Sequence, residues 1–160
     1  MRQLTLGWLT LIKATPPDVI SAAHAAGFKS VSIRITGRKP GDGFPQSVGN
    51  EPAMRDLKKR LADGGLRLSN TSSYHLTPDI TLDMLRPVID ASVELGAAIM
   101  VATCSDPDHK RWADFASRYC EEARKAGLKV ALEFVPFSEA KTIEQGNALV
   151  QAVGAPISDC

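Results

Sequence analysis

The sequence lacks the features that mark several specialised classes of protein. It has three cysteines among 160 residues, and their odd number and wide spacing argue against a disulfide framework or a cysteine-based zinc site. No apolar run approaches the roughly 20 residues that a membrane-spanning helix needs. The first residues, MRQLTLGWLTLIKATPPD, carry no small-residue cleavage site of a signal peptide. We therefore expect a cytoplasmic protein with no membrane partner.

An excess of charge of one sign is also absent. The chain has 19 lysines and arginines against 18 aspartates and glutamates, which gives a formal net charge of +1. No basic stripe is present that would follow a phosphate backbone, so we expect no nucleic-acid partner. With 44% hydrophobic and 23% charged residues, the composition is that of an ordinary globular domain, and we predict a single domain over residues 1–160.

What the sequence does contain is an alternation of short apolar runs with segments of helical period, repeated about every 30 residues. This rhythm predicts five βα units in a parallel sheet. The expected strands are Leu4–Trp8, Ser30–Thr36, Leu66–Ser73, Ala97–Cys104 and Lys129–Val135.

The intervening helices have recognisable ends. Thr15 followed by two prolines and an acid predicts the start of the first helix, and Thr142 with Gln145 predicts the capping box of the last. Each helix is expected to end at a glycine, as a left-handed C-terminal cap favours; these are Gly27, Gly65, Gly96, Gly127 and Gly154. Pro87 predicts either a start of the third helix near Leu85 or a kink there.

Side-chain alternation helps to choose between an open sheet and a barrel. The second strand has Val31, Ile33 and Ile35 on one face, with Ser32, Arg34 and Thr36 on the other. The third sets Leu66 and Leu68 against Arg67, Ser69 and Thr71, and the fifth sets Val130, Leu132 and Phe134 against Ala131 and Glu133. A doubly wound sheet lies under helices on both faces and should be apolar on both. One apolar and one polar face therefore favour a barrel with a confined interior.

The run KVALEFVPF at residues 129–137 places Glu133 among apolar residues. A buried ionised carboxylate costs several kcal/mol unless it is paired, hydrogen-bonded or bound to a metal. Two interpretations remain open: a functional carboxylate at the mouth of the barrel, or an ion pair inside it, for which Arg34 is the expected partner.

Three segments, 32–36 (SIRIT), 94–97 (ELGA) and 127–137 (GLKVALEFVPF), resemble the xylose isomerase-like TIM-barrel superfamily. The resemblance extends over essentially the whole chain. It implies a partial (β/α)8 TIM barrel of about five parallel βα units, apparently truncated after the fifth because residues 155–160 stand where the sixth strand should begin. A full barrel needs about 250 residues.

The resemblance also implies that Glu133 is a divalent-metal ligand, for Mn²⁺, Mg²⁺ or Zn²⁺, that takes part in proton transfer. Family members complete this site with an Asp, a His and a second Glu from the sixth to eighth strands. Because those strands are missing from the predicted fold, we expect the metal to bind weakly, if at all, in this chain.

Four other residues are candidates for the site. Arg34 could grip a carboxylate, phosphate or enediolate oxygen, or simply neutralise Glu133. His75, expected just past the third strand, could be a general base or remain an exposed loop residue. Cys104 could line the pocket or be a small buried residue, and Trp8, expected to close the first strand, could stack on a sugar or pack at the rim.

The resemblance favours a metal-dependent isomerase or epimerase of a sugar or related hydroxy-carbonyl compound, acting by proton abstraction and enediolate stabilisation. A dehydratase on the same scaffold would share the first step. The alternative is a non-catalytic partial barrel that binds a partner or self-associates, since unpaired strand edges recruit other strands. We expect a small sugar-like substrate and a homo-oligomer formed through the open barrel edges.

Overall fold

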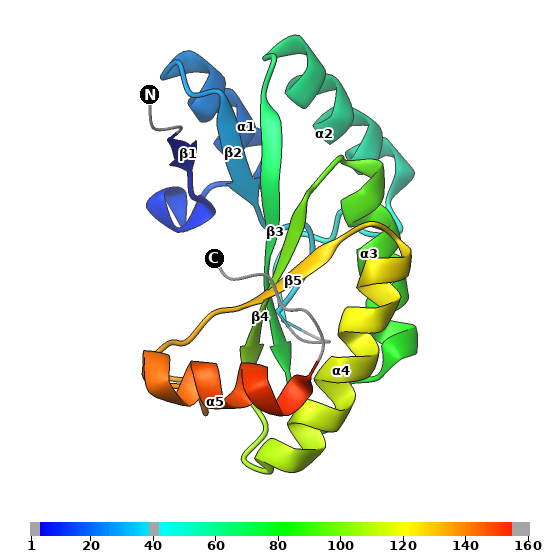
Figure 1. Cartoon of the computed structure of the whole chain (residues 1–160). Helices are drawn as coiled ribbons and strands as arrows, with labels where there is room; N and C mark the ends of the chain where they lie inside the picture. Colours follow the sequence, from blue (N-terminus) through cyan, green and yellow to red (C-terminus); the bar gives the residue numbers. More distant parts are fainter. Residues whose placement is uncertain (1–3, 39–41, 155–160) are drawn as a thin grey trace.

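The computed structural model describes residues 4–38 and 42–154, which form five strands, five α-helices and one 3-10 helix (Figure 1). The elements follow one another in βα order from the N-terminus. They are β1 (Thr5–Leu6), η1 (Trp8–Leu11), α1 (Pro16–Ala25), β2 (Ser30–Ile33), α2 (Glu51–Asp63), β3 (Arg67–Leu76), α3 (Leu82–Glu94), β4 (Ile99–Cys104), α4 (His109–Lys125), β5 (Lys129–Leu132) and α5 (Ile143–Val153).

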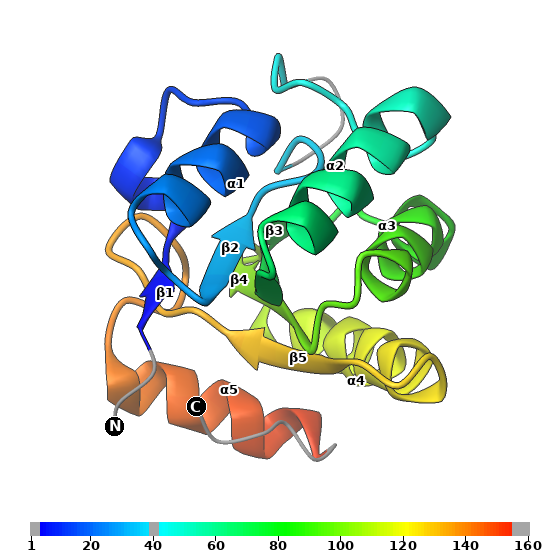
Figure 2. The ribbon, with the colours of Figure 1, turned by 90° about the horizontal axis from the view of Figure 1, so that it is seen from above.

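The five strands make one parallel sheet in the order β1-β2-β3-β4-β5. Sequential order with parallel neighbours is the arrangement of a barrel wall, because an open doubly wound sheet reverses its strand order part-way. Seen along the strands, the helices surround the outer side of the curved sheet (Figure 2). The predicted fold class, a partial barrel of βα units, is confirmed. The predicted start of a sixth strand, at residues 155–160, lies outside the described residues.

The predicted helix ends are also confirmed. All five α-helices are followed by a glycine with a positive φ of 57 to 80°, a conformation that costs a glycine little because it has no Cβ. Threonine caps begin α1, α3 and α5, and Thr15 and Asp18 form a reciprocal capping box. In α5, Thr142 accepts from the Gln145 amide, but the Gln145 side chain accepts from the Lys141 amide and not from that of Thr142, so the predicted capping box is only half formed.

Of the two alternatives predicted for Pro87, the start of the third helix near Leu85 is wrong. Helix α3 begins at Leu82, and Thr81 caps it by accepting a hydrogen bond from the Met84 amide. Pro87 therefore lies inside the helix. The cap sets the start of the helix even though the proline removes one later amide donor.

The strand ends differ from those predicted. The regular parts of β1, β2 and β5 are shorter than expected, and β3 is longer, so that His75 lies within the strand and not just past it. The predicted side-chain pattern of β3 is also wrong at Thr71, which is fully buried and hydrogen-bonded to Ser92 of α3 at 2.9 Å. The pairing of β3 with β2 shifts register between Leu68 and Asn70, so that Ser69 is skipped. This extra residue in β3 moves Thr71 to the helix-facing side.

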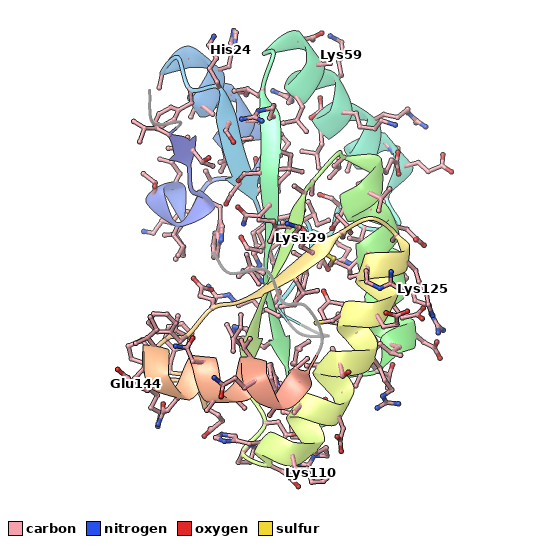
Figure 3. All side chains as sticks on the ribbon, in the orientation of Figure 1. His24, Lys59, Lys110, Lys125, Lys129 and Glu144 are labelled. Carbon is pink, nitrogen blue, oxygen red and sulfur yellow. The ribbon has the colours of Figure 1, made fainter. Side chains whose placement is uncertain are left out.

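The core lies between the sheet and the helices. Its largest fully buried side chains include Ile20 of α1, Ile33 of β2, Leu57 of α2, Met100 of β4 and Tyr119 of α4. The charged side chains of the same helices point away from the sheet, as Lys59, Lys110 and Lys125 illustrate (Figure 3). Within residues 4–38 and 42–154, no helix is long and apolar enough to cross a lipid bilayer.

Candidate active site

The predicted site residues lie where the strands end. Trp8 follows β1, Arg34 follows β2, His75 is near the end of β3, Cys104 ends β4 and Glu133 follows β5. In a parallel barrel these carboxyl ends meet at one mouth, which is where TIM-barrel enzymes place their active sites. The contacts of each residue show which of them point to that mouth.

Arg34 lies on the concave face of the sheet. Its neighbours Ile33 and Ile35 are fully buried in the core, so alternation turns Arg34 the other way. Its Nε donates to the Thr36 carbonyl at 3.0 Å, and its Nη2 donates to Asp42, with which it forms an ion pair. The expected ion pair between Arg34 and Glu133 is therefore not formed; Asp42, only eight residues along the chain, takes the place of Glu133.

Two aromatic rings enclose the Arg34 guanidinium. Its Cζ lies 4.0 Å from the centre of the Phe44 ring and 5.7 Å from that of Trp8. The Cζ of Arg38 lies 5.4 Å from the same Trp8 ring. Such cation–π contacts favour a charged group that is partly desolvated. We call this group of residues, Trp8, Arg34, Arg38, Asp42 and Phe44, the arginine cluster.

Trp8 itself does not close β1. It begins the 3-10 helix η1 and is buried. Since two guanidinium groups lie over its ring, Trp8 holds the arginines in place, which agrees with the packing alternative and leaves little of its ring for a sugar to stack on.

Asp42 links three residues of the arginine cluster, Arg34, Arg38 and Phe44. Besides its bond with Arg34, it accepts the amide of Arg38 at 2.6 Å and the amide of Phe44 at 3.1 Å. Burial opposes the ionised form, but these amides and Arg34 outweigh it and lower the pKa of Asp42. For Arg34, burial has the largest effect and lowers its pKa despite Asp42, and the nearby charge of Arg38 acts in the same direction.

Glu133 lies on the same face at the other side of the mouth. Its amide donates to the Ala102 carbonyl at 2.8 Å, which continues the pairing of β5 with β4 by one residue. The next residue, Phe134, packs against Gly146 of α5, so alternation directs Glu133 toward the concave side. Glu133 is half-buried, and no carboxylate bond from it to another described residue is formed.

His75 connects the two sides of the mouth. Its amide donates to the Arg38 carbonyl at 3.1 Å, next to the arginine cluster. Its ring centre is 6.5 Å from that of Phe137, in the segment that follows β5. The half-buried imidazole thus lies at the mouth between β2 and the β5 side.

Cys104 does not share this position. Met100, four residues earlier in β4, accepts a hydrogen bond from the Tyr119 hydroxyl of α4, and alternation puts Cys104 on that same helix-facing side. The thiol is fully buried, with its Sγ 3.6 Å from the Asp106 carbonyl. Burial raises its pKa to about 11. The structure thus agrees with the alternative of a small buried residue, away from the mouth.

The residues that sequence reasoning missed all come from the loop of residues 37–50. Arg38, Asp42 and Phe44 have no periodic pattern, and the available signal was a long Gly- and Pro-rich segment after a strand. Among the described residues, no group of three His, Cys, Asp or Glu side chains is placed to hold a metal ion. Glu133 is therefore not part of a set of three such ligands in this part of the chain.

Residues 20–157 match the family model described as xylose isomerase-like TIM barrel. The chain belongs to this family. The sequential parallel sheet and the polar mouth agree with that membership, and the resemblance seen in the segments around Arg34 and Glu133 is confirmed.

Solved structures show the same fold. The chain is similar to the probable 3-DHS dehydratase AsbF from Bacillus anthracis (13% identity, TM-score 0.74), to the IolI protein with a bound zinc atom (17%, 0.75) and to L-ribulose 3-epimerase (19%, 0.67). Each comparison covers 98% of this chain but 61%, 60% and 59% of the respective neighbour. The chain thus spans about three fifths of the length of these xylose isomerase-like relatives. No curated protein sequence matches it.

Proposed function

We propose that the protein is an isomerase or epimerase of a sugar or related hydroxy-carbonyl compound, in which the Glu133 carboxylate moves a proton next to the carbonyl group. Members of the same fold named as L-ribulose 3-epimerase and as a sugar phosphate isomerase/epimerase from Parabacteroides distasonis support this reaction class. The chain covers 50 to 59% of the length of those two proteins. The proposal therefore rests on the residues at the mouth of this chain.

The position of Glu133 is the observation that carries the proposal. Its carboxylate is half-buried on the concave side and is not neutralised by Arg34, which Asp42 already pairs. A carboxylate in such a position can accept a proton from carbon. Arg34 offers a fixed positive charge for the oxygen on which negative charge develops, and His75 can relay a proton at the same mouth.

A divalent metal is the cofactor that this family implies, and bound metal supplies positive charge for a developing enediolate oxygen. Glu133 is the residue that would ligate it. The donor set of the described residues does not fit a metal centre, because they bring together no group of three His, Cys, Asp or Glu side chains, and such sites have three or more protein ligands. We therefore propose that Mn²⁺, Mg²⁺ or Zn²⁺ binds weakly, if at all, to this chain.

The proposal is tested by proton exchange in D2O. Incubation with a panel of aldoses, ketoses and their phosphates, followed by NMR, should show deuterium entering next to the carbonyl group. Glu133→Gln should lower the exchange rate by a factor of about 10²–10⁴. Glu51→Gln is the matched control, since Glu51 lies on the exposed side of α2. Equal exchange in the two variants would refute the role of Glu133.

The same incubations distinguish the dehydratase alternative when their ultraviolet absorbance is followed. Loss of water forms a conjugated carbonyl product that absorbs in the ultraviolet. The metal is tested by following thermal stability during titration with Mn²⁺ or Mg²⁺. We expect a small shift that Glu133→Gln removes. No shift in either protein, together with no exchange activity, would leave the enzyme assignment without support.

A second candidate is a non-catalytic partial barrel that self-associates. In the described sheet, β1 and β5 each have a single neighbouring strand. Large apolar side chains are exposed beside both edges, with Leu4 70% exposed next to β1 and Phe137 72% exposed after β5. Unpaired edges with apolar flanks favour association. Sedimentation at micromolar concentration should then show dimers, and a compact monomer would count against this candidate.

A further inference from the structure

The arginine cluster contains more positive than negative charge. Arg34 and Arg38 both lie over Trp8, and Asp42 is the one carboxylate that bonds to either residue in the described part of the chain. The Asp42 carboxylate forms its ion pair with Arg34, whereas from Arg38 it accepts the backbone amide. One guanidinium charge is therefore left without a carboxylate partner within the cluster.

The unpaired charge belongs to a residue whose backbone is held firmly. The Arg38 amide donates to Asp42 at 2.6 Å, and the Arg38 carbonyl accepts the amide of His75 at 3.1 Å. The guanidinium also rests on the Trp8 ring. An arginine fixed in this way loses little further freedom when it binds a ligand, which is the condition of a preorganised site.

The Nε of Arg38 is buried and has no hydrogen-bond acceptor among the described residues. A buried donor without a partner costs folding free energy, and an ordered water or a bound ion is one way in which native structures satisfy such a group. The donors Nε and Nη of arginine form a planar fork that matches the oxygens of a carboxylate or a phosphate.

Space is present next to Arg38. A cavity of about 470 Å³ is lined by polar residues that include Thr36, Arg38 and Gln46 and by apolar residues that include Val48 and Met84. A small molecule with one anionic end would find both a donor and an apolar wall there.

From these observations we propose that Arg38, held by Trp8 and Asp42, binds the carboxylate or phosphate group of a small anionic ligand at the barrel mouth. Arg34 stays paired with Asp42, so the net positive charge of the cluster is that of Arg38. What this proposal says about the substrate rests on the proposed function. It narrows the substrate to an anionic hydroxy-carbonyl compound, which is a sugar phosphate or a sugar acid. Binding of the anion itself requires no turnover and can be measured alone.

The two tryptophans of the chain make a direct measurement possible. Trp112→Phe leaves Trp8 as the fluorescent tryptophan, and it sacrifices no hydrogen bond because the Trp112 Nε1 has no partner among residues the structure describes. In this background we would titrate inorganic phosphate and, separately, acetate, with sodium chloride at the same ionic strength as the reference. Trp8 emission should change in a saturable way with at least one of the two anions.

Variants of the arginines assign the effect. Arg38→Gln should weaken anion binding about tenfold or more, as expected for the loss of a charge-assisted hydrogen bond. Arg38→Lys keeps the charge without the fork and should weaken it less. Arg55→Gln is the control, because Arg55 lies exposed on α2 beside Glu51. Equal affinity in Arg38→Gln and Arg55→Gln, or no saturable change with either anion, would overturn the proposal.

The remaining outcomes distinguish the ligand and the two proposals. Tighter binding of phosphate supports a phosphorylated ligand, and tighter binding of acetate supports a sugar acid. If proton exchange is absent while Arg38-dependent anion binding persists, the proposed reaction fails and the anion site stands. Should Arg38→Gln unfold, Arg38→Lys supplies the same comparison in a protein that keeps the charge.

Discussion

The charged residues on the two sides of the barrel mouth differ in whether other residues bond to them. On the β2 side, Arg34 is enclosed by aromatic rings and paired with Asp42, whose remaining bonds go to backbone amides. On the β5 side, Glu133 is half-buried, and the described residues provide it with no ion pair. The difference teaches that Arg34 is held in place by its neighbours, whereas the Glu133 carboxylate forms no bond to the described residues.

The largest expected effect on stability comes from removing the ion pair between Arg34 and Asp42 on the β2 side. Asp42→Ala leaves the Arg34 charge and two amides without their acceptor, and should lower the free energy of unfolding by about 2–3 kcal/mol. Urea denaturation measures the change. Asp83→Ala is the matched control, because it removes an ion pair with Arg86 in which the Asp83 side chain is 85% exposed; this should cost less than about 1 kcal/mol. Similar losses in the two variants would contradict the buried character of the Asp42 pair.

Acid should weaken the same side. Because the pKa of Asp42 is lower in the folded protein than in the unfolded chain, its contribution is complete above the unfolded pKa of about 3.9. The contribution is lost as pH falls through the lower, folded value. The difference in unfolding free energy between the parent protein and Asp42→Asn should therefore shrink from pH 7 to pH 3. A difference that stays constant over this range would exclude an ionised, stabilising Asp42.

A change on the β5 side should instead stabilise the protein. Gly146 lies inside α5, and a Cβ added there would meet the Phe134 Cβ at 3.7 Å, an ordinary van der Waals distance. Gly146→Ala should raise the free energy of unfolding by about 0.5–1 kcal/mol, because alanine restricts the unfolded chain and favours the helix. Thermal and urea unfolding provide the measurement. A loss of stability would show that Phe134 cannot accommodate the methyl group.

The smallest effect on stability is expected at Glu133. Glu133→Gln removes a charge that no described ion pair uses, so the free energy of unfolding should change by less than about 0.5 kcal/mol. If the variant instead loses stability to the degree expected for Asp42→Ala, then the Glu133 carboxylate has a structural partner. The comparison between the two sides of the mouth would then fail.

Local chemistry predicted much of the fold, because its signals are short in range. The glycines after each helix and the threonine caps Thr15 and Thr142 act within one turn, and the structure has them where the sequence predicts them. The cap of α3, Thr81, was not predicted. The faces of β2 and β5 were also predicted, since alternation holds as long as a strand is regular. In β3 it failed at Thr71, because the slip near Ser69 depends on pairing with β2, which the sequence of β3 does not encode.

The site was predicted in part for the same reason. Glu133 and Arg34 follow strands, so their position at the mouth could be inferred. The partner of Arg34 could not, because Asp42 comes from an irregular loop whose path is set by hydrogen bonds to Arg38 and Phe44. Cys104 was placed in the right strand, but Met100 and Tyr119 show that its side chain turns to α4.

The burial of Cys104 has a practical consequence that it shares with Cys120 of α4. Both thiols are buried and free, and burial raises the pKa of each to about 11, so at neutral pH they are protonated and shielded from alkylating reagents. Each can react when the layer between β4 and α4 opens. The rate at which iodoacetamide modifies these two cysteines therefore measures how often β4 and α4 separate.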